Sequence, residues 1–256
     1  TTLMHAVRRH AYAIRGQSVP VLPVPAAPRL LPFTDPGQIA WQGSVGAAFY
    51  EVERATATNQ TWTVLATNVD EAFTQYRPVF CDENVLAGTW YYRVRAGNMS
   101  GWSPPSNLIG PLTVTQVTFV DEMADFSRLL TYSTGWKSVT QSSRVTKEDI
   151  HRLAGSSRTS LTYKVNGQPC RLKVYAFYEK NPGQVKLSVS TDNEHFTPVP
   201  VRAENAFHGQ GDYGYWKPVL FTADTFPAGK FIKLEAVEPV QIGRLEIVQA
   251  APAPVP

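Results

Sequence analysis

Several separate runs of this sequence alternate between apolar and polar residues, and this period of two constrains the fold most. In GTWYYRVRAGN, residues 88–98, one side of the run carries Trp90, Tyr92, Val94 and Ala96, and the other carries Tyr91, Arg93 and Arg95. Successive side chains of a strand point to opposite faces, so such a run predicts a strand with one buried face. Further strand-like runs are SLTYKV, RLKVYAFYE, QVKLSVSTD, KFIKLEAV and QIGRLEIVQ. Because Thr, Val, Tyr and Trp are also frequent, we expect an all-β protein.

One helical pattern stands at the N-terminus. Its apolar stripe recurs at spacings of three and four, as Leu3, Val7, Ala11 and Ile14. Gly16 suits the residue just past the end of such a helix. A helix of roughly 12 residues is marginal alone in water, so the stripe needs a surface to pack on. The proline-rich segment that follows predicts an extended, semi-rigid spacer.

The length of 256 residues suits two domains of ordinary size. Regularly spaced short strands with turn signals between them predict two β-sandwiches in series. The expected divisions are a helix at 1–16, a linker at 17–28, a first sandwich at 29–113, a second at 114–250, and a disordered tail at 251–256.

Charge and motif content argue against several classes of function. The formal net charge is +3 and no long basic run occurs, so we do not expect a nucleic-acid partner. No stretch of about 18 apolar residues occurs, so we expect no membrane span. A glycosidase needs two carboxylates that face each other across the sugar. The acidic pairs of this chain, Asp121–Glu122 and Glu148–Asp149, are neighbours in sequence and so do not suit that arrangement. We therefore expect no catalytic residue in this chain and no catalytic cofactor.

The first predicted sandwich resembles a fibronectin type III domain. The matching residues are Trp41, Tyr50, Val52, Arg54, residues 92–96, Asn98, Gly101, Ser103 and Ser106. Trp90 departs from that family, because it stands where the family usually carries its corner tyrosine. An indole N–H donates a hydrogen bond as a phenol does, but with different geometry, so we expect a rebuilt corner there.

The second predicted sandwich resembles the galactose-binding-like jelly rolls, the fold of many carbohydrate-binding modules. The matching segments are DEMADFS, SVSTDNEHFTPV and IGRLEI, and their order along the chain carries the resemblance. In this domain we expect a tight turn at Asp192 and Asn193, and a short helical turn in EDIHRLAGSS, residues 148–157.

The helix, the linker and both domains in this order resemble the C-terminal region of bacterial β-mannanase-type glycoside hydrolases. The segments GSVGAAFYEVERA, YRPVFCDE, KEDIHRLAG and GDYGYWKPV carry this resemblance. It implies that residues 1–16 are the last helix of a catalytic TIM barrel, whose roughly 250 residues this chain lacks. It also implies a secreted protein, extracellular or periplasmic. Its partners would be that barrel and a mannan-type or other β-glycan.

Sugar recognition uses flat aromatic faces against the C–H side of a pyranose and polar groups for its hydroxyls. The candidates in the second domain are Trp136, Tyr213, Tyr215 and Trp216, with Asp212, His208 and Arg152. Trp136 follows a Ser-Thr-Gly run, which is an exposed setting for an indole. The alternative is that these aromatic residues cap the sandwich core or dock it on a neighbouring domain.

Three carboxylates are candidates for a structural calcium site. Sandwiches of this class often hold Ca²⁺ through oxygen ligands on their terminal strands. Asp121 and Glu122 stand on the first strand of the second domain, and Glu246 stands on its closing strand. The alternative is that these carboxylates are simply solvated.

Three functions remain open at this point. The chain is an accessory region through which a polysaccharide hydrolase binds its polymer, a structural brace for the catalytic barrel, or an extracellular adhesion module with a protein partner. Binding to a polysaccharide separates the first function from the second. An apolar surface patch without a groove favours the third.

Overall fold

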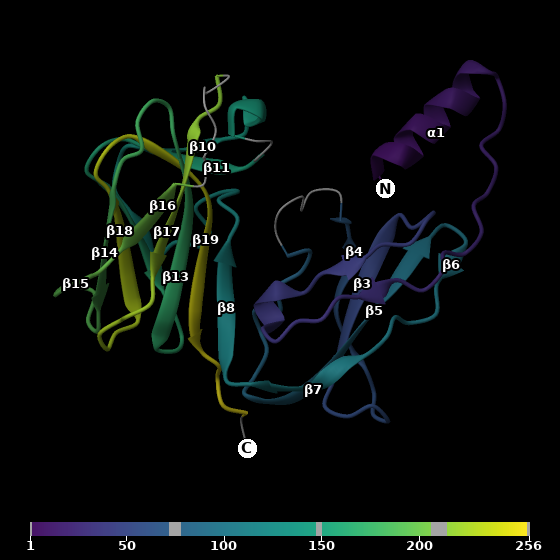
Figure 1. Ribbon diagram of the computed structural model, residues 1–256, viewed down its shortest axis with the longest axis horizontal. Coiled ribbons are helices and arrows are strands. Elements are labelled where there is room, and N and C mark those ends of the chain that lie inside the picture. The colour runs from purple at the N-terminus through teal and green to yellow at the C-terminus, as the bar shows by residue number, and fades with distance from the viewer. Residues whose placement is uncertain (1, 72–77, 147–149, 206–213, 255–256) are drawn as a thin grey trace. The chain divides into compact units, whose positions relative to one another are not determined.

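The computed structural model describes residues 2–71, 78–146, 150–205 and 214–254 (Figure 1). The chain divides into two compact units, unit 1 of Thr1–Val117 with Ala253–Pro256 and unit 2 of Thr118–Pro252. Regular structure in the described residues is nearly all β-strand, as the alternating runs predicted. No helix among these residues is long and apolar enough to cross a membrane.

The N-terminal helix α1, Thr2–Ile14, ends as the sequence predicts. Gly16 has a φ of +63°, and its N–H donates to the carbonyl of Ala13 at 3.0 Å. Glycine is common at this left-handed position because it has no Cβ to clash. Two residues of the predicted stripe, Val7 and Ile14, are 54% and 72% exposed. The helix therefore leaves apolar surface open.

The proline-rich segment 17–28 contains no helix or strand, as its composition predicts, but it is not a free spacer. Asn98 donates from Nδ2 to the carbonyl of Pro23 at 2.8 Å, and Ser100 donates to the carbonyl of Leu22. Extended backbone of this kind keeps carbonyls that accept such bonds. The linker is thus held against a turn of unit 1.

Unit 1 is a small sheet structure with the predicted alternation. Its strands are β1 (Arg29–Leu30), β2 (Trp41–Gln42), β3 (Phe49–Ala55), β4 (Thr63–Val69), β5 (Gly88–Asn98), β6 (Gly101–Trp102) and β7 (Ile109–Val114), with a 3-10 helix at Pro36–Gln38. The main sheet has the order β4-β3-β5-β6, with β7 also on β5, and β1 pairs with β2. Tyr92 and Val94 of β5 are fully buried, whereas Arg93 on the other face pairs with Glu53 at 2.7 Å.

Trp90 makes the hydrogen bond that its position in the sequence predicted. Its Nε1 donates to the carbonyl of Leu86 at 2.8 Å. A corner tyrosine bonds to upstream backbone in the same way, through its hydroxyl. The hydroxyls of Ser103 and Ser106 accept hydrogen bonds from backbone N–H groups of β5, which fixes the segment that follows the strand.

Unit 2 is a β-sandwich. Its strands are β8 (Gln116–Asp121), β9 (Thr131–Tyr132), β10 (Trp136–Val139), β11 (Arg152–Gly155), β12 (Thr159–Lys164), β13 (Pro169–Tyr178), β14 (Val185–Ser190), β15 (Thr197–Val199), β16 (Arg202–Asn205), β17 (Lys217–Ala223), β18 (Phe231–Ala236) and β19 (Val240–Ala250). A seven-stranded sheet has the order β10-β11-β19-β13-β17-β16, with β8 on β19, and a five-stranded sheet has the order β15-β14-β18-β12-β9. Their inner faces share one apolar core, to which Leu161 and Leu234 contribute from one sheet and Val174 and Leu245 from the other.

The short helical turn predicted within 148–157 is wrong for the described part of that segment. Residues 152–155 form β11, which pairs with both β10 and β19. A 3-10 helix lies just before the segment, at Ser143–Thr146. Strand pairing with partners distant in sequence therefore decided the conformation of this stretch.

Candidate functional site

The structure separates the predicted sugar-binding residues. Asp212, Tyr213 and His208 lie outside the described residues. Trp136 belongs to the apolar core of unit 2. Arg152 and Trp216 both form hydrogen bonds to one loop, which runs from Gln141 to the 3-10 helix at Ser143–Thr146.

Trp136 is placed differently from the exposed setting that its sequence context predicted. It is 8% exposed, and it pairs in register with Gly155 across β10 and β11. A Cβ at position 155 would lie 2.6 Å from the indole ring, so the glycine leaves the space that the ring fills. The indole Nε1 has no hydrogen-bond partner among the described residues. Trp136 is therefore a core residue here.

Arg152 holds the loop at one end. It is 1% exposed at the start of β11. Its Nε donates to the side-chain oxygen of Gln241 at 2.7 Å, and its Nη2 donates to the carbonyl of Gln141. A buried guanidinium needs such acceptors, because burying a charge without partners is costly. These bonds make Arg152 a residue that positions the loop.

Trp216 holds the same loop at its other end. Its backbone N–H donates to the carbonyl of Val145, in the 3-10 helix, at 2.8 Å. Tyr215 and Trp216 are both half-buried, just before β17. The site therefore combines two partly exposed aromatic side chains with a loop fixed at two points. A flat ring of this kind can stack on a sugar, and the exposed Gln141 amide can bond its hydroxyls.

Asp121, one of the predicted calcium ligands, is turned into the core of unit 2. It is 1% exposed, and it accepts from the backbone N–H of Met123 at 2.8 Å and from the hydroxyl of Tyr163 at 3.1 Å. Burial raises the pKa of Asp121, although these hydrogen bonds offset part of the effect. Burial also raises the pKa of the Tyr163 hydroxyl, so this hydroxyl stays a donor.

The other two predicted ligands, Glu122 and Glu246, are bound by an arginine. Arg244 donates from Nε to Glu246 at 2.7 Å, and its Nη1 forms an ion pair with Glu122. Burial lowers the pKa of Arg244, but both carboxylates raise it by more, so the guanidinium stays charged. Calcium takes six to eight oxygen ligands. With a guanidinium between two of the carboxylates and Asp121 turned away, this residue set does not fit a calcium ion.

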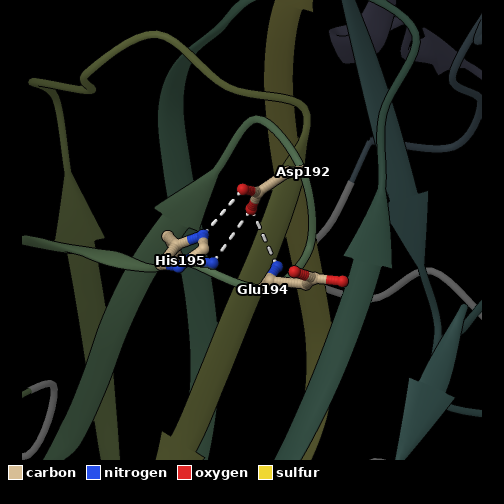
Figure 2. Close-up of side chains that lie close together, drawn as sticks. All are labelled: Asp192, Glu194 and His195. Carbon is tan, nitrogen blue, oxygen red and sulfur yellow. Dashed lines mark hydrogen bonds and ion pairs between the residues drawn. The ribbon is translucent and has the colours of Figure 1, made fainter.

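A group of His, Cys, Asp or Glu side chains close enough to share a metal occurs elsewhere in the described part of the chain, at Asp192, Glu194 and His195 (Figure 2). All three are exposed. Asp192 accepts from the backbone N–H groups of Glu194 and His195 at 2.8 and 2.9 Å, and its second oxygen lies 2.8 Å from His195 Nδ1. The hydrogen bond from the His195 side chain is the main cause that lowers the pKa of Asp192. The group is the tight turn predicted at Asp192 and Asn193, built by the Asp192 carboxylate.

Sequence reasoning missed the roles of Arg244 and Gln241. A signal for Arg244 was present, because Arg244 and Glu246 are two residues apart on a predicted strand and so share one face. Gln241 gave no such signal. Its contact with Arg152 spans 89 residues and depends on the pairing of β11 with β19.

Comparisons with known proteins give distant likenesses. No protein-family profile and no curated protein sequence matches the chain. The CBM51-2 and INT domains of Clostridium perfringens ZmpB, in complex with GlcNAc, match with a TM-score of 0.29 and 12% identity, over 67% of this chain and 39% of that one. Carbohydrate-binding modules of the β-sandwich superfamily match with a TM-score of 0.24 and 11% identity, over 88% and 97%. An α-L-rhamnosidase from Aspergillus terreus matches with a TM-score of 0.22 and 10% identity, over 90% and 28%. TM-scores this low say nothing about function.

Proposed function

We propose that this chain is a non-catalytic accessory region of a secreted polysaccharide-degrading glycoside hydrolase, and that unit 2 binds the polysaccharide. The observation that carries the proposal is the loop fixed between Arg152 and Trp216. Two partly exposed aromatic side chains, those of Tyr215 and Trp216, belong to the segment that bonds to this loop just before β17. A contact surface that is already ordered loses little conformational entropy when a ligand binds.

Most of the accessible groups at this loop suit a sugar polymer. The guanidinium of Arg152 is 1% exposed and already bonded to Gln241 and Gln141, so it does not offer a free charge. The accessible groups at this loop are ring faces, amides and hydroxyls, together with the exposed Arg144 of the 3-10 helix. These groups suit the C–H faces and hydroxyls of a pyranose.

The enzyme context is proposed from the sequence resemblance to β-mannanase-type hydrolases. A mannan-type or other β-glycan would be the polymer, and a catalytic barrel would be the partner of α1. The exposed Val7 and Ile14 support this role for α1, because an isolated helix of this length needs a surface on which to pack its apolar side.

Affinity electrophoresis of the full chain tests the proposed function. Native gels with galactomannan, glucomannan, xylan or a soluble cellulose derivative should retard the protein on at least one polymer. Trp216→Ala should weaken that binding roughly tenfold, the effect of losing about 1.4 kcal/mol of aromatic contact. The matched control is Tyr132→Ala, which removes an exposed aromatic side chain from β9 in the other sheet and should bind as wild type.

Equal mobility of wild type on all four polymers would overturn the proposal. So would a folded Trp216→Ala variant that is retarded as strongly as wild type. The thermal midpoint of each variant, measured on the same preparation, separates lost contact from lost folding.

A second candidate function is a structural brace, and surface residues of unit 1 favour it. Val45 and Met99 are 97% and 98% exposed, and Val21 is 83% exposed. Gly46, beside Val45, accepts a hydrogen bond from Asn98, beside Met99, so the two turns are joined. Exposed apolar side chains gathered in this way mark interaction surfaces. If no polysaccharide retards the chain, co-purification of unit 1 with a separately expressed barrel is the expected result, and attachment to an unrelated protein would indicate adhesion.

A further inference from the structure

One ion-pair cluster joins the beginning and the end of unit 2. Arg244 lies on β19, the last strand of the unit, and Glu122 directly follows β8, the first. The contact spans 122 residues of sequence. Arg244 is 2% exposed and its second partner, Glu246, is 4% exposed, so that ion pair is poorly screened by water or salt, whereas the Glu122 side chain is 49% exposed.

Neighbouring side chains complete the cluster. Glu246 shares the face of Arg244 on β19, and Lys173 lies opposite it on β13, with Nζ 3.8 Å from Oε2 of Glu246. The hydroxyl of Tyr175, opposite Arg244, lies 3.5 Å from Glu246 Oε1. Two carboxylates therefore meet two cations, and the formal charge of the cluster is balanced.

A divalent ion would disturb this balance. Calcium bound to either carboxylate at about 2.3 to 2.6 Å would lie close to the buried Arg244 guanidinium, and the two positive charges would repel each other. Both oxygens that Arg244 contacts would also have to exchange a hydrogen-bond donor for the metal. The donors already present satisfy the carboxylates without a metal.

We propose that Arg244 is the built-in cation that fastens Glu122, after β8, to the closing strand β19, and that this junction consequently needs no metal ion. The guanidinium links the two carboxylates as a structural metal ion would, because it is a fixed positive charge with hydrogen-bond donors directed at both of them. This proposal does not depend on what unit 2 binds.

Thermal unfolding of the full chain tests the proposal directly. We expect the midpoint of wild type to be unchanged by EDTA and by millimolar calcium. Arg244→Ala should lower the midpoint by several degrees, because it removes the cation that contacts both carboxylates. The matched control, Arg202→Ala, removes an exposed arginine from the edge strand β16 of the same sheet and should leave the midpoint unchanged.

Two further variants keep the test decisive if Arg244→Ala folds poorly. Arg244→Lys, which keeps the charge, should retain more stability than Arg244→Ala. In a Glu122→Gln background, Arg244→Ala should lower the thermal midpoint by less than it does in wild type, because one charged partner of Arg244 is already removed. A wild-type midpoint that falls with EDTA or rises with calcium would overturn the proposal. Equal midpoints for Arg244→Ala and Arg202→Ala would also overturn the proposal. So would decreases in midpoint that simply add when Arg244→Ala and Glu122→Gln are combined.

Discussion

Replacing Trp136 by Ala removes an indole that is 8% exposed and packs over Gly155. A buried tryptophan takes about 200 Å² out of water, which at about 25 cal/mol/Å² corresponds to about 5 kcal/mol. The indole N–H has no hydrogen-bond partner among the described residues, so its removal returns about 1 to 2 kcal/mol. We therefore expect Trp136→Ala to lower the free energy of unfolding of unit 2 by about 3 to 4 kcal/mol.

Gly155→Ala probes the same contact from the other side. The added Cβ would lie 2.6 Å from the indole ring, and overpacking of this kind costs about 1 to 3 kcal/mol. In the Trp136→Ala background the methyl group would meet no ring, so the two costs should not add. Trp136→Phe keeps a ring over Gly155 and removes the unpaired N–H, so it should cost less than Trp136→Ala.

Urea unfolding followed by hydrogen exchange of unit 2 peptides measures these free energies separately from unit 1. Affinity electrophoresis of Trp136→Phe then shows whether the indole contacts the polymer, and we expect wild-type retardation. A Trp136→Ala variant that is as stable as wild type, but is no longer retarded by any polysaccharide, would refute this reasoning. The indole would then be a contact surface and not part of the core.

The remaining predictions concern two single groups. Trp90→Phe removes the donor to the Leu86 carbonyl and should lower the free energy of unfolding of unit 1 by about 1 kcal/mol in the same exchange experiment; no change would mean that this bond does not hold the corner. Burial raises the pKa of Asp121 above its ordinary value of 3.8, so the native state binds this proton more tightly than the unfolded state. The stabilisation that comes from this tighter proton binding is fully present below pH 3.8, and it is lost as the pH rises through the pKa of Asp121 in the folded state. Asp121→Asn should remove this decrease in the free energy of unfolding with rising pH. If wild type and variant instead give parallel profiles of unfolding free energy against pH, the pKa of Asp121 is not raised.

Elements specified by local patterns were predictable from the sequence. The end of α1 at Gly16 follows from one residue that tolerates a positive φ. The alternation along β5 follows from side-chain direction in a strand, and the buried Tyr92 and Val94 confirm it. The turn at Asp192 likewise depends on a carboxylate that bonds backbone only two and three residues ahead.

The candidate site was less predictable, because its contacts join segments that are distant in sequence. Arg152 was chosen as a group that bonds sugar, but β11 and β19 place it beside Gln241, where it holds a loop. The sequence around Trp136 suits an exposed indole and left core burial as the alternative, and Gly155, on the neighbouring strand, decides for burial.

By itself, the sequence determined that this chain forms sheets, and where many of the strands and turns lie, because period, turn chemistry and capping act within a few residues. Only the tertiary structure decided which strands pair with one another, and which charged side chain contacts which partner. Glu122 and Glu246 could have faced water, a metal or an arginine. The pairing of β8 with β19 brings Glu122 to Arg244, which already lies beside Glu246 on its own strand, and no local pattern of residues encodes the contact with Glu122.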